Sequence, residues 1–340
     1  MPAAPKVIAL VATRLRSDLL ARLLDSLHRQ TIRPIASVVC DNGPDPATVA
    51  AAKTSPLSCE LVSPEKNLGF GGGLAAAAER AFGRFPDLTH LLVVDDDAIL
   101  APKDLESLLA SATQHSAGSV APFLIDATGK LQEVPEPVSW PLARAFRSAG
   151  QDLQKARLLA PNGYPMAWCI GPCLLVDQGT WLRAGPPRSD MLAFGDDVEF
   201  SLRLSAASPA WAEPSVTVIH APPASPRYGR LAEASGSPLP AALRPPSEAA
   251  PPQGFAAKEG PRSSIPNPQS QNDAAHYKKF GILLQNLAFT CVASPRPRHL
   301  PLYLPGNAKR FLRTFGFTPA SFLEVTRRYL KGFLGIPGSR

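Results

Sequence analysis

Hydrophobic runs of strand length alternate with segments of helical periodicity in the first third of the chain. Leucines at positions 19, 20, 23, 24 and 27 lie on one helical face, which predicts a helix over Ser17–Arg29 with Ser17 as its N-cap. The apolar runs predict strands at Val7–Ala12, Ile35–Cys40, Glu60–Val62 and Leu91–Val94. Further helices are expected at Ala47–Lys53, Gly71–Phe82 and Pro102–Ala112.

This alternation predicts βαβ units and an α/β fold built on a mostly parallel central sheet flanked by helices. Ligands of such sheets bind at the carboxyl ends of the strands. Each unusual polar cluster follows a predicted strand, and together they indicate one functional cleft. The clusters are Thr13–Arg16, Asp41-Asn42, Asn67 and Asp95–Asp97.

The periodicity is weaker in the rest of the chain. Residues 122–161 suggest mixed loop and helix, and Ala167–Val176 suggests one strand followed by a short helix at Thr180–Ala184. Met191–Leu204 carries an acidic cluster into a helix, and Ser215–Ile219 is a strand that ends at His220.

Composition divides the chain into three parts. Of the 38 prolines, 12 fall in residues 222–270, so residues 222–272 are expected to form a flexible insert or linker. Residues 1–221 are the expected catalytic domain, and residues 273–340 a basic, mostly helical C-terminal region. That region holds 11 Lys or Arg against two acidic residues in a chain of net charge +7, which favours an anionic partner.

Residues 309–334 combine basic and aromatic side chains in an amphipathic pattern. Peripheral membrane contact and packing of an ordinary helix on the catalytic domain explain this pattern equally well. No signal peptide and no 18-residue apolar stretch is visible, and the five scattered cysteines form a poor zinc pattern. We therefore expect reduced thiols and a cytoplasmic protein, which contact through residues 309–334 would place at the inner face of the cell membrane.

Three adjacent carboxylates at a strand end, Asp95, Asp96 and Asp97, repel one another unless a cation is shared. They favour a divalent metal site over a solvated acidic loop or a helix cap. His220 ends another strand and is a candidate third ligand, although a lone histidine is more often structural. The glycines at 71–73 suggest close approach to a phosphate-bearing ligand, a weak signal that a plain turn also explains.

A second acidic pair, Asp196-Asp197, precedes a predicted helix that also carries Glu199 and Arg203. A carboxylate in a cleft suits a general base that activates a hydroxyl group. The alternative is a helix-capping pair with a surface Glu–Arg ion pair, and taken alone this pattern favours the alternative.

In this order the motifs resemble glycosyltransferase family 2, the inverting enzymes with a GT-A fold, and within it bacterial rhamnosyl- and galactofuranosyl-transferase-like members. The likeness covers roughly residues 6–222. It implies a nucleotide-sugar donor of the UDP or dTDP type and a glycan or lipid-linked acceptor in envelope or polysaccharide assembly. Departures at Arg14, Pro44 and Gly195 leave the donor sugar and the acceptor open.

The resemblance also implies a role for each matching residue. Thr13, Arg16 and Asp41 would hold the nucleoside, Asn67 and Gly69 would lie near the ribose and diphosphate, and Asp95 and Asp96 would also contact the donor. Asp95, Asp97 and His220 would bind Mn²⁺ or Mg²⁺. Asp197 would be the catalytic base, and Asp196 would orient the acceptor.

Two other functions fit part of the pattern. A sugar-1-phosphate nucleotidyltransferase would show a glycine-rich, basic loop after the first strand, whereas residues 12–17 contain no glycine. A non-catalytic nucleotide- or glycan-binding protein would be expected to lack Asp197 or the Asp95–Asp97 cluster, and both are present. Nucleic-acid binding has no recognisable motif here and is not expected.

Overall fold

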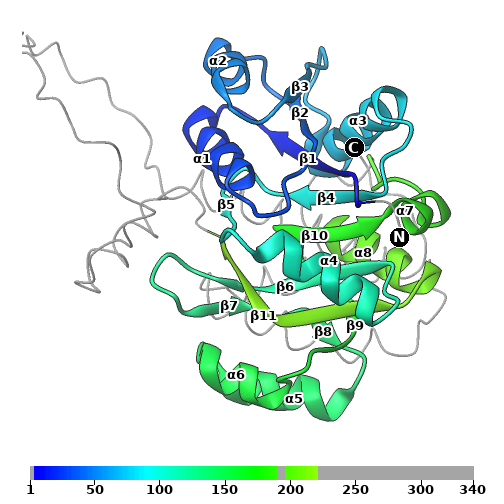
Figure 1. The fold of residues 1–340 in the computed structure, drawn as a ribbon. Coiled ribbons are helices and arrows are strands. Elements are labelled where there is room, and N and C mark those ends of the chain that lie inside the picture. The colour runs from blue at the N-terminus through cyan, green and yellow to red at the C-terminus, as the bar shows by residue number, and fades with distance from the viewer. Residues whose placement is uncertain (1–3, 190–195, 221–340) are drawn as a thin grey trace, which may run out of the picture.

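The computed structural model describes residues 4–189 and 196–220, which form a mixed sheet with helices on both faces (Figure 1). The proposed insert at 222–272, the basic region at 273–340 and the membrane-contact segment at 309–334 lie outside the described residues.

The strands are β1 (Val7–Thr13), β2 (Ala36–Asp41), β3 (Cys59–Val62), β4 (His90–Val94), β5 (Ala98–Ile99), β6 (Ser119–Ile125), β7 (Leu131–Glu133), β8 (Glu136–Pro137), β9 (Tyr164–Trp168), β10 (Cys173–Asp177) and β11 (Ala210–His220). The helices are α1 (Ser17–His28), α2 (Pro46–Thr54), α3 (Gly69–Arg84), α4 (Asp104–Gln114), α5 (Trp140–Ala149), α6 (Leu153–Leu159), α7 (Gln178–Ala184) and α8 (Asp196–Ala207).

The sheet has the strand order β3-β2-β1-β4-β10-β6-β11-β9-β8, with β5 paired to β11 and β7 paired to β6. Strands β1 to β4 are parallel, as the alternating pattern predicts, and β6 and β11 are also parallel to each other. Strand β10 runs antiparallel between β4 and β6. The second half of the sheet is therefore mixed. The first half is parallel, and the predicted cleft lies at the carboxyl ends of its strands.

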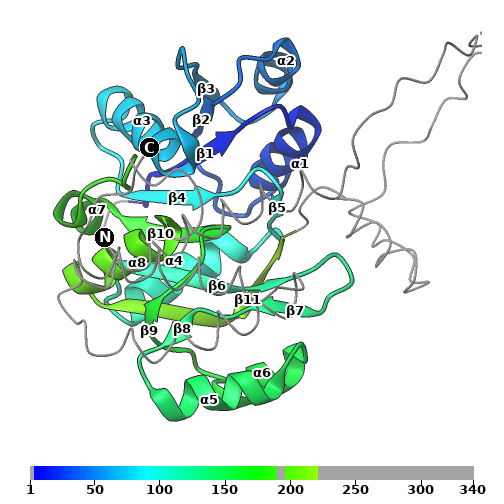
Figure 2. The ribbon, with the colours of Figure 1, turned by 180° about the vertical axis from the view of Figure 1, so that it is seen from behind.

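Alternate residues of the strands serve two hydrophobic layers, as the period of a β-strand requires. On β1, Val7, Ala9 and Val11 pack with leucines of α1 and α4. Ile8 and Leu10 pack on the opposite layer with α3, α7 and α8. Figures 1 and 2 show these two faces from opposite sides. Because both faces are covered, the functional residues lie at the ends of the strands.

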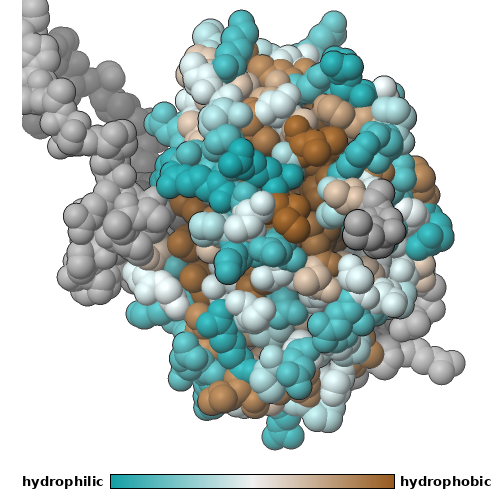
Figure 3. Space-filling model, viewed as in Figure 1, coloured by the Kyte–Doolittle hydropathy of each residue, from teal (hydrophilic) through white to brown (hydrophobic). Residues whose placement is uncertain are grey.

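Helices α5 and α6 lie side by side at the end of the molecule opposite α2 in both ribbon views. On the face seen in Figure 3, hydrophilic residues cover most of the surface, and hydrophobic residues show mainly over β1 and β4. Within residues 4–189 and 196–220, no helix combines the length and the apolar character needed to cross a bilayer.

Three sequence predictions need correction. Ala167–Val176 is two strands, β9 and β10, because Gly171-Pro172 makes a turn between them. Helix α1 begins at Ser17 itself, with Arg16 at the N-cap position and no side-chain capping bond. Residues 122–161 contain strands as well as the two helices of the α5–α6 hairpin.

Candidate active site

Asp95, Asp97 and His220 come together at the end of β4. Strand β5 follows the acidic run directly and pairs with the end of β11, so that His220 lies opposite Ala98 and beside Asp97. One ligand atom from each of the three residues lies within 4.8 Å of the others. His220 Nε2 is 3.4 Å from Asp97 Oδ1. The structure thus brings together the three residues predicted as metal ligands, from positions more than a hundred residues apart.

The donor set suits a divalent cation. The Oδ1 atoms of Asp95 and Asp97 are buried without a hydrogen-bond partner, and a buried, unpaired carboxylate oxygen is costly. Burial, and then the neighbouring charge of Asp97, raises the pKa of Asp95 to about 8. Burial lowers the pKa of His220, but the Asp97 and Asp95 carboxylates outweigh this effect and raise it overall. The two carboxylates are ligands that Mn²⁺ and Mg²⁺ accept, and an imidazole is a common ligand of divalent transition metals.

Asp96, between the two carboxylates of this cluster, is tied to the loop after β1. The register of β1 and β4 sets Leu10 level with Val93, so Thr13 lies beside Asp96. The Thr13 hydroxyl donates to Asp96 Oδ2 over 2.6 Å, and Arg16 Nη1 lies 3.0 Å from Asp96 Oδ1. Burial raises the pKa of Asp96, and these two donors oppose that rise.

The loops after β2 and β3 are joined by Asn42. Its Oδ1 accepts from the backbone N–H of Leu68, and its Nδ2 donates to the carbonyl of Gly69. Asp41 is fully buried, and its two carboxylate oxygens accept from the backbone N–H groups of Gly43 and Asp45. Asn67 is exposed and accepts from the Gly69 N–H. In this structure the Asp41 carboxylate stabilises the turn after β2. Its contact with a nucleoside stays a prediction.

Backbone N–H groups from two other elements hold the second acidic pair at the start of α8. Gly71, on α3, donates to Asp196 Oδ2 over 3.2 Å, and Gly171, in the β9–β10 turn, donates to Asp197 Oδ2 over 3.1 Å. Asp196 is buried, and burial raises its pKa to about 6. Asp197 is only partly buried, so it is the more accessible carboxylate of the pair.

The β9–β10 turn links the two acidic clusters. Pro172 accepts a hydrogen bond from the backbone N–H of Asp95, while the adjacent Gly171 donates to Asp197. A Cβ atom added at Gly171 would lie 3.3 Å from the Asp197 Cβ and 3.1 Å from the Phe70 ring. The apolar pattern of the sequence did not predict this turn, although a Gly-Pro dipeptide is typical of one.

The glycine run at 71–73 packs against protein. A Cβ atom on Gly71 would lie 2.4 Å from the Arg188 carbonyl oxygen, and one on Gly72 would lie 2.9 Å from Leu68. A Cβ atom on Gly73 would lie 2.9 Å from Asn42. These contacts replace the sequence interpretation in which the glycines make room for a ligand: they let residues 187–189 lie on α3.

The Glu199–Arg203 pair is structural, as the alternative interpretation held. Arg203 Nε lies 2.7 Å from Glu199 Oε1 one helical turn earlier. The guanidinium also donates to the carbonyl groups of Ala184, Gly185 and Pro186. Arg203 therefore fastens the segment after α7 to α8, just before residues 187–189, which pack on α3.

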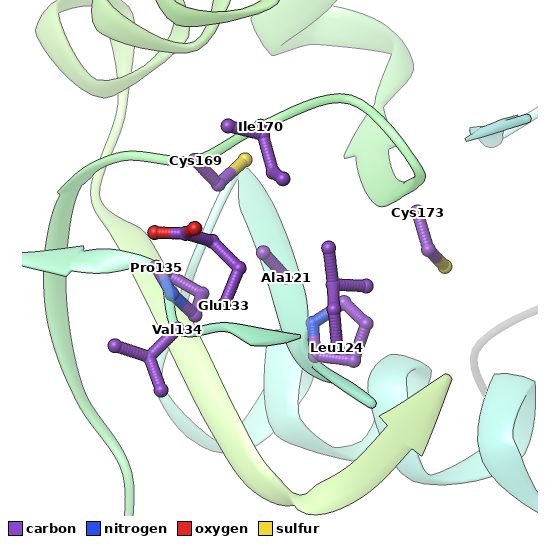
Figure 4. Close-up of a pocket in the computed structure, with 9 residues that line it drawn as sticks. Ala121, Leu124, Glu133, Val134, Pro135, Cys169, Ile170 and Cys173 are labelled. Atoms are coloured by element: carbon purple, nitrogen blue, oxygen red, sulfur yellow. The ribbon is translucent and has the colours of Figure 1, made fainter. Parts of the chain in front are cut away.

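The four described cysteines are free thiols, as expected. Cys169 and Cys173 lie apart on either side of the β9–β10 turn, around a cavity of only about 10 Å³ (Figure 4). Burial raises the pKa of Cys169 to about 12, which makes it a poor metal ligand or nucleophile. Glu133 and Pro135 line the same cavity from β7 and the residues after it.

Comparison with known proteins identifies the kind of domain. The model of the glycosyl transferase family 2 matches residues 9–161. An N-acetylglucosaminyl-diphospho-decaprenol L-rhamnosyltransferase from Mycobacterium tuberculosis is 24% identical over 229 residues, which cover 59% of this chain and 71% of the relative. Galactofuranosyltransferase GlfT1 from Mycolicibacterium smegmatis is 31% identical over 143 residues, which cover 41% of this chain and 44% of the relative.

The fold also has a solved counterpart. The structure of S. aureus TarS with UDP-GlcNAc superimposes with a TM-score of 0.54 at 14% identity, covering 96% of this chain and 81% of that one. At that identity the likeness concerns the fold alone, and it confirms the predicted GT-A arrangement of a central sheet flanked by helices.

Proposed function

We propose that this chain is a metal-dependent, inverting glycosyltransferase, because the model of the glycosyl transferase family 2 matches residues 9–161. It moves a sugar from a nucleoside-diphosphate donor of the UDP or dTDP type to a hydroxyl group of the acceptor. The observation that carries the proposal is the convergence of Asp95, Asp97 and His220, with two buried carboxylate oxygens that lack a hydrogen-bond partner.

In this proposal Asp95, Asp97 and His220 hold Mn²⁺ or Mg²⁺. A bound divalent cation supplies positive charge that stabilises the negative charge developing on the leaving diphosphate. The neighbouring residues bind and orient the donor along the same strand ends. They are Thr13, Arg16, Asp41, Asn67, Gly69, Asp95 and Asp96.

Asp197 acts as the general base. It accepts the proton of an acceptor hydroxyl, whose oxygen then attacks the anomeric carbon from the face opposite the diphosphate. The Gly171 N–H holds its Oδ2 atom, which fixes the direction of the carboxylate. Asp196, held by Gly71, orients the acceptor. One displacement inverts the anomeric configuration, without a covalent sugar–protein intermediate.

The acceptor class follows from the relatives. One is named for an acceptor built on diphospho-decaprenol, and another for galactofuranosyl transfer. We propose a glycan or lipid-linked acceptor in cell-envelope or polysaccharide assembly. This agrees with the basic, aromatic composition of residues 309–334, which suits an anionic membrane surface, and with a cytoplasmic location at that surface.

Thermal unfolding with UDP-, dTDP- and GDP-sugars tests the proposal. With Mn²⁺ and a donor near a hundred times its Kd, the wild-type melting temperature should rise by about 5–10 °C. The rise should disappear in Asp97→Ala and with EDTA. It should persist in the control Glu79→Ala, an exposed residue of α3. A donor-induced rise of equal size in Asp97→Ala and wild type would contradict the metal site.

A further inference from the structure

Gln132, on β7, makes two hydrogen-bond contacts with His220. Its Nε2 donates to the His220 carbonyl oxygen over 3.1 Å, and its Oε1 lies 3.2 Å from His220 Nδ1. The two residues are 88 positions apart in the chain. Strand β7 pairs with the end of β6, and β11 pairs with β6 on its other side, so the Gln132 amide reaches past the end of β6 to His220.

These two contacts define which nitrogen of the imidazole carries the proton when the ring is neutral. A backbone carbonyl has no hydrogen to give, so the group that faces it must be the NH₂ of Gln132. The other end of the amide is therefore its oxygen, which only accepts. Consequently Nδ1 of His220 must carry the ring proton, and in the neutral ring Nε2 presents its lone pair.

That lone pair faces the acidic cluster. Nε2 lies 3.4 Å from Asp97 Oδ1, and the nearby Oδ1 atoms of Asp95 and Asp97 have no hydrogen-bond partner. With the ring neutral, three electron-pair donors then lie within 4.8 Å of one another. A second residue that fixes the tautomer and direction of a ligating histidine commonly changes metal affinity by about 10- to 100-fold.

We propose that Gln132 is a positioning residue, which holds His220 in the Nδ1–H tautomer so that Nε2 binds the divalent cation. The inference rests on the proposed metal site and extends it to a residue with no ligand role of its own. Gln132 lies in the stretch where the sequence pattern is weak, and it belongs to none of the recognised motifs.

Two readouts on the full chain test this role. Long-range ¹H–¹⁵N NMR of the metal-free protein at alkaline pH, assigned with His220→Gln, reports which ring nitrogen carries the proton. We expect protonated Nδ1 in wild type and in Gln132→Glu, whose carboxylate still accepts from Nδ1, and a mixture of tautomers in Gln132→Ala. Calorimetric titration with Mn²⁺ should show affinity lowered about tenfold or more in Gln132→Ala. Affinity should fall less in Gln132→Glu than in Gln132→Ala, because the carboxylate keeps the acceptor for Nδ1 and loses only the donor to the His220 carbonyl.

Gln154→Ala, at an exposed position of α6, is the matched control and should match wild type in both readouts. Protonated Nε2 in the wild type, or Mn²⁺ affinity in Gln132→Ala within about twofold of wild type, would overturn the role of Gln132 alone. Failure of the wild type to bind Mn²⁺, with Nδ1 protonated, would instead overturn the metal site of the proposed function and this use of Gln132 with it.

Discussion

Replacing Gly71 with alanine should lower turnover far more than it lowers the stability of the fold. Gly71 lies in the first turn of α3, where residues 187–189 of the loop after α7 pack on the helix. Alanine there would place its Cβ atom 2.4 Å from the Arg188 carbonyl oxygen, closer than such atoms approach in proteins. The obstacle is backbone, so the loop and the helix must move apart. The same residue donates the hydrogen bond that holds Asp196.

The magnitude follows from two opposing effects. Relieving a 2.4 Å contact to the 3.0 Å minimum requires a displacement of about 0.6 Å, and overpacking of this kind costs about 1–3 kcal/mol. Alanine regains about 1 kcal/mol of helix propensity. The net loss of folding free energy is therefore about 0–2 kcal/mol. A displacement approaching 1 Å at the acidic pair is expected to lower turnover about a hundredfold.

The assay is release of nucleoside diphosphate from the donor, alongside the melting temperature. Gly83→Ala is the matched control on the same helix, because a Cβ atom there has no neighbour within 4 Å. It should raise stability by about 0.5–1 kcal/mol and leave turnover unchanged. Wild-type turnover in Gly71→Ala would refute the argument that α3 positions Asp196 through this contact.

Three further predictions concern stability. Burial raises the pKa of Asp104 to about 6, so the folded state holds its proton more tightly than the unfolded state, and stability falls as pH rises from about 4 to 6. Asp104→Asn should remove this part of the fall, to which Asp196 also contributes, and should be more stable than wild type at pH 7 by on the order of 2 kcal/mol. Equal pH profiles of the two proteins in urea unfolding would contradict this. Arg203→Ala should lower the free energy of unfolding by about 2 kcal/mol, because the hydrogen bonds to the carbonyl groups after α7 are lost. An unchanged denaturant midpoint would show that these bonds do not stabilise the fold. Thr13→Val should lower stability by about 1–3 kcal/mol, since the buried Asp96 loses a donor; an unaltered melting temperature would argue against that bond.

Much of the fold was predictable because its determinants are local. Apolar runs of strand length and the leucine spacing of α1 specify the parallel half of the sheet. The meeting of Asp95, Asp97 and His220 was also predictable, since each follows or ends a strand and strand ends share an edge. The Gly171-Pro172 dipeptide indicates a turn between β9 and β10, but the apolar residues on either side of it suggested one longer strand.

Other features depend on tertiary contacts that no local pattern encodes. The glycine run at 71–73 has the composition of a ligand loop, yet what fills the space beside it is the chain at Arg188 and Leu68. Gln132 is one unremarkable residue in a weakly patterned stretch, and only the folded sheet brings its amide to His220. The buried Asp41 is likewise a turn-shaping residue by its contacts, which residue type alone does not reveal.

The most direct test of the central claim is an anomalous diffraction measurement on crystals grown with Mn²⁺ and UDP. We expect a manganese peak between Asp95, Asp97 and His220, within about 2–2.5 Å of ligand oxygen or nitrogen atoms, and beside the diphosphate. Crystals of Asp97→Ala should lack that peak. An ordered UDP diphosphate with no manganese at the cluster, or with manganese held by other residues, would contradict the proposed metal site.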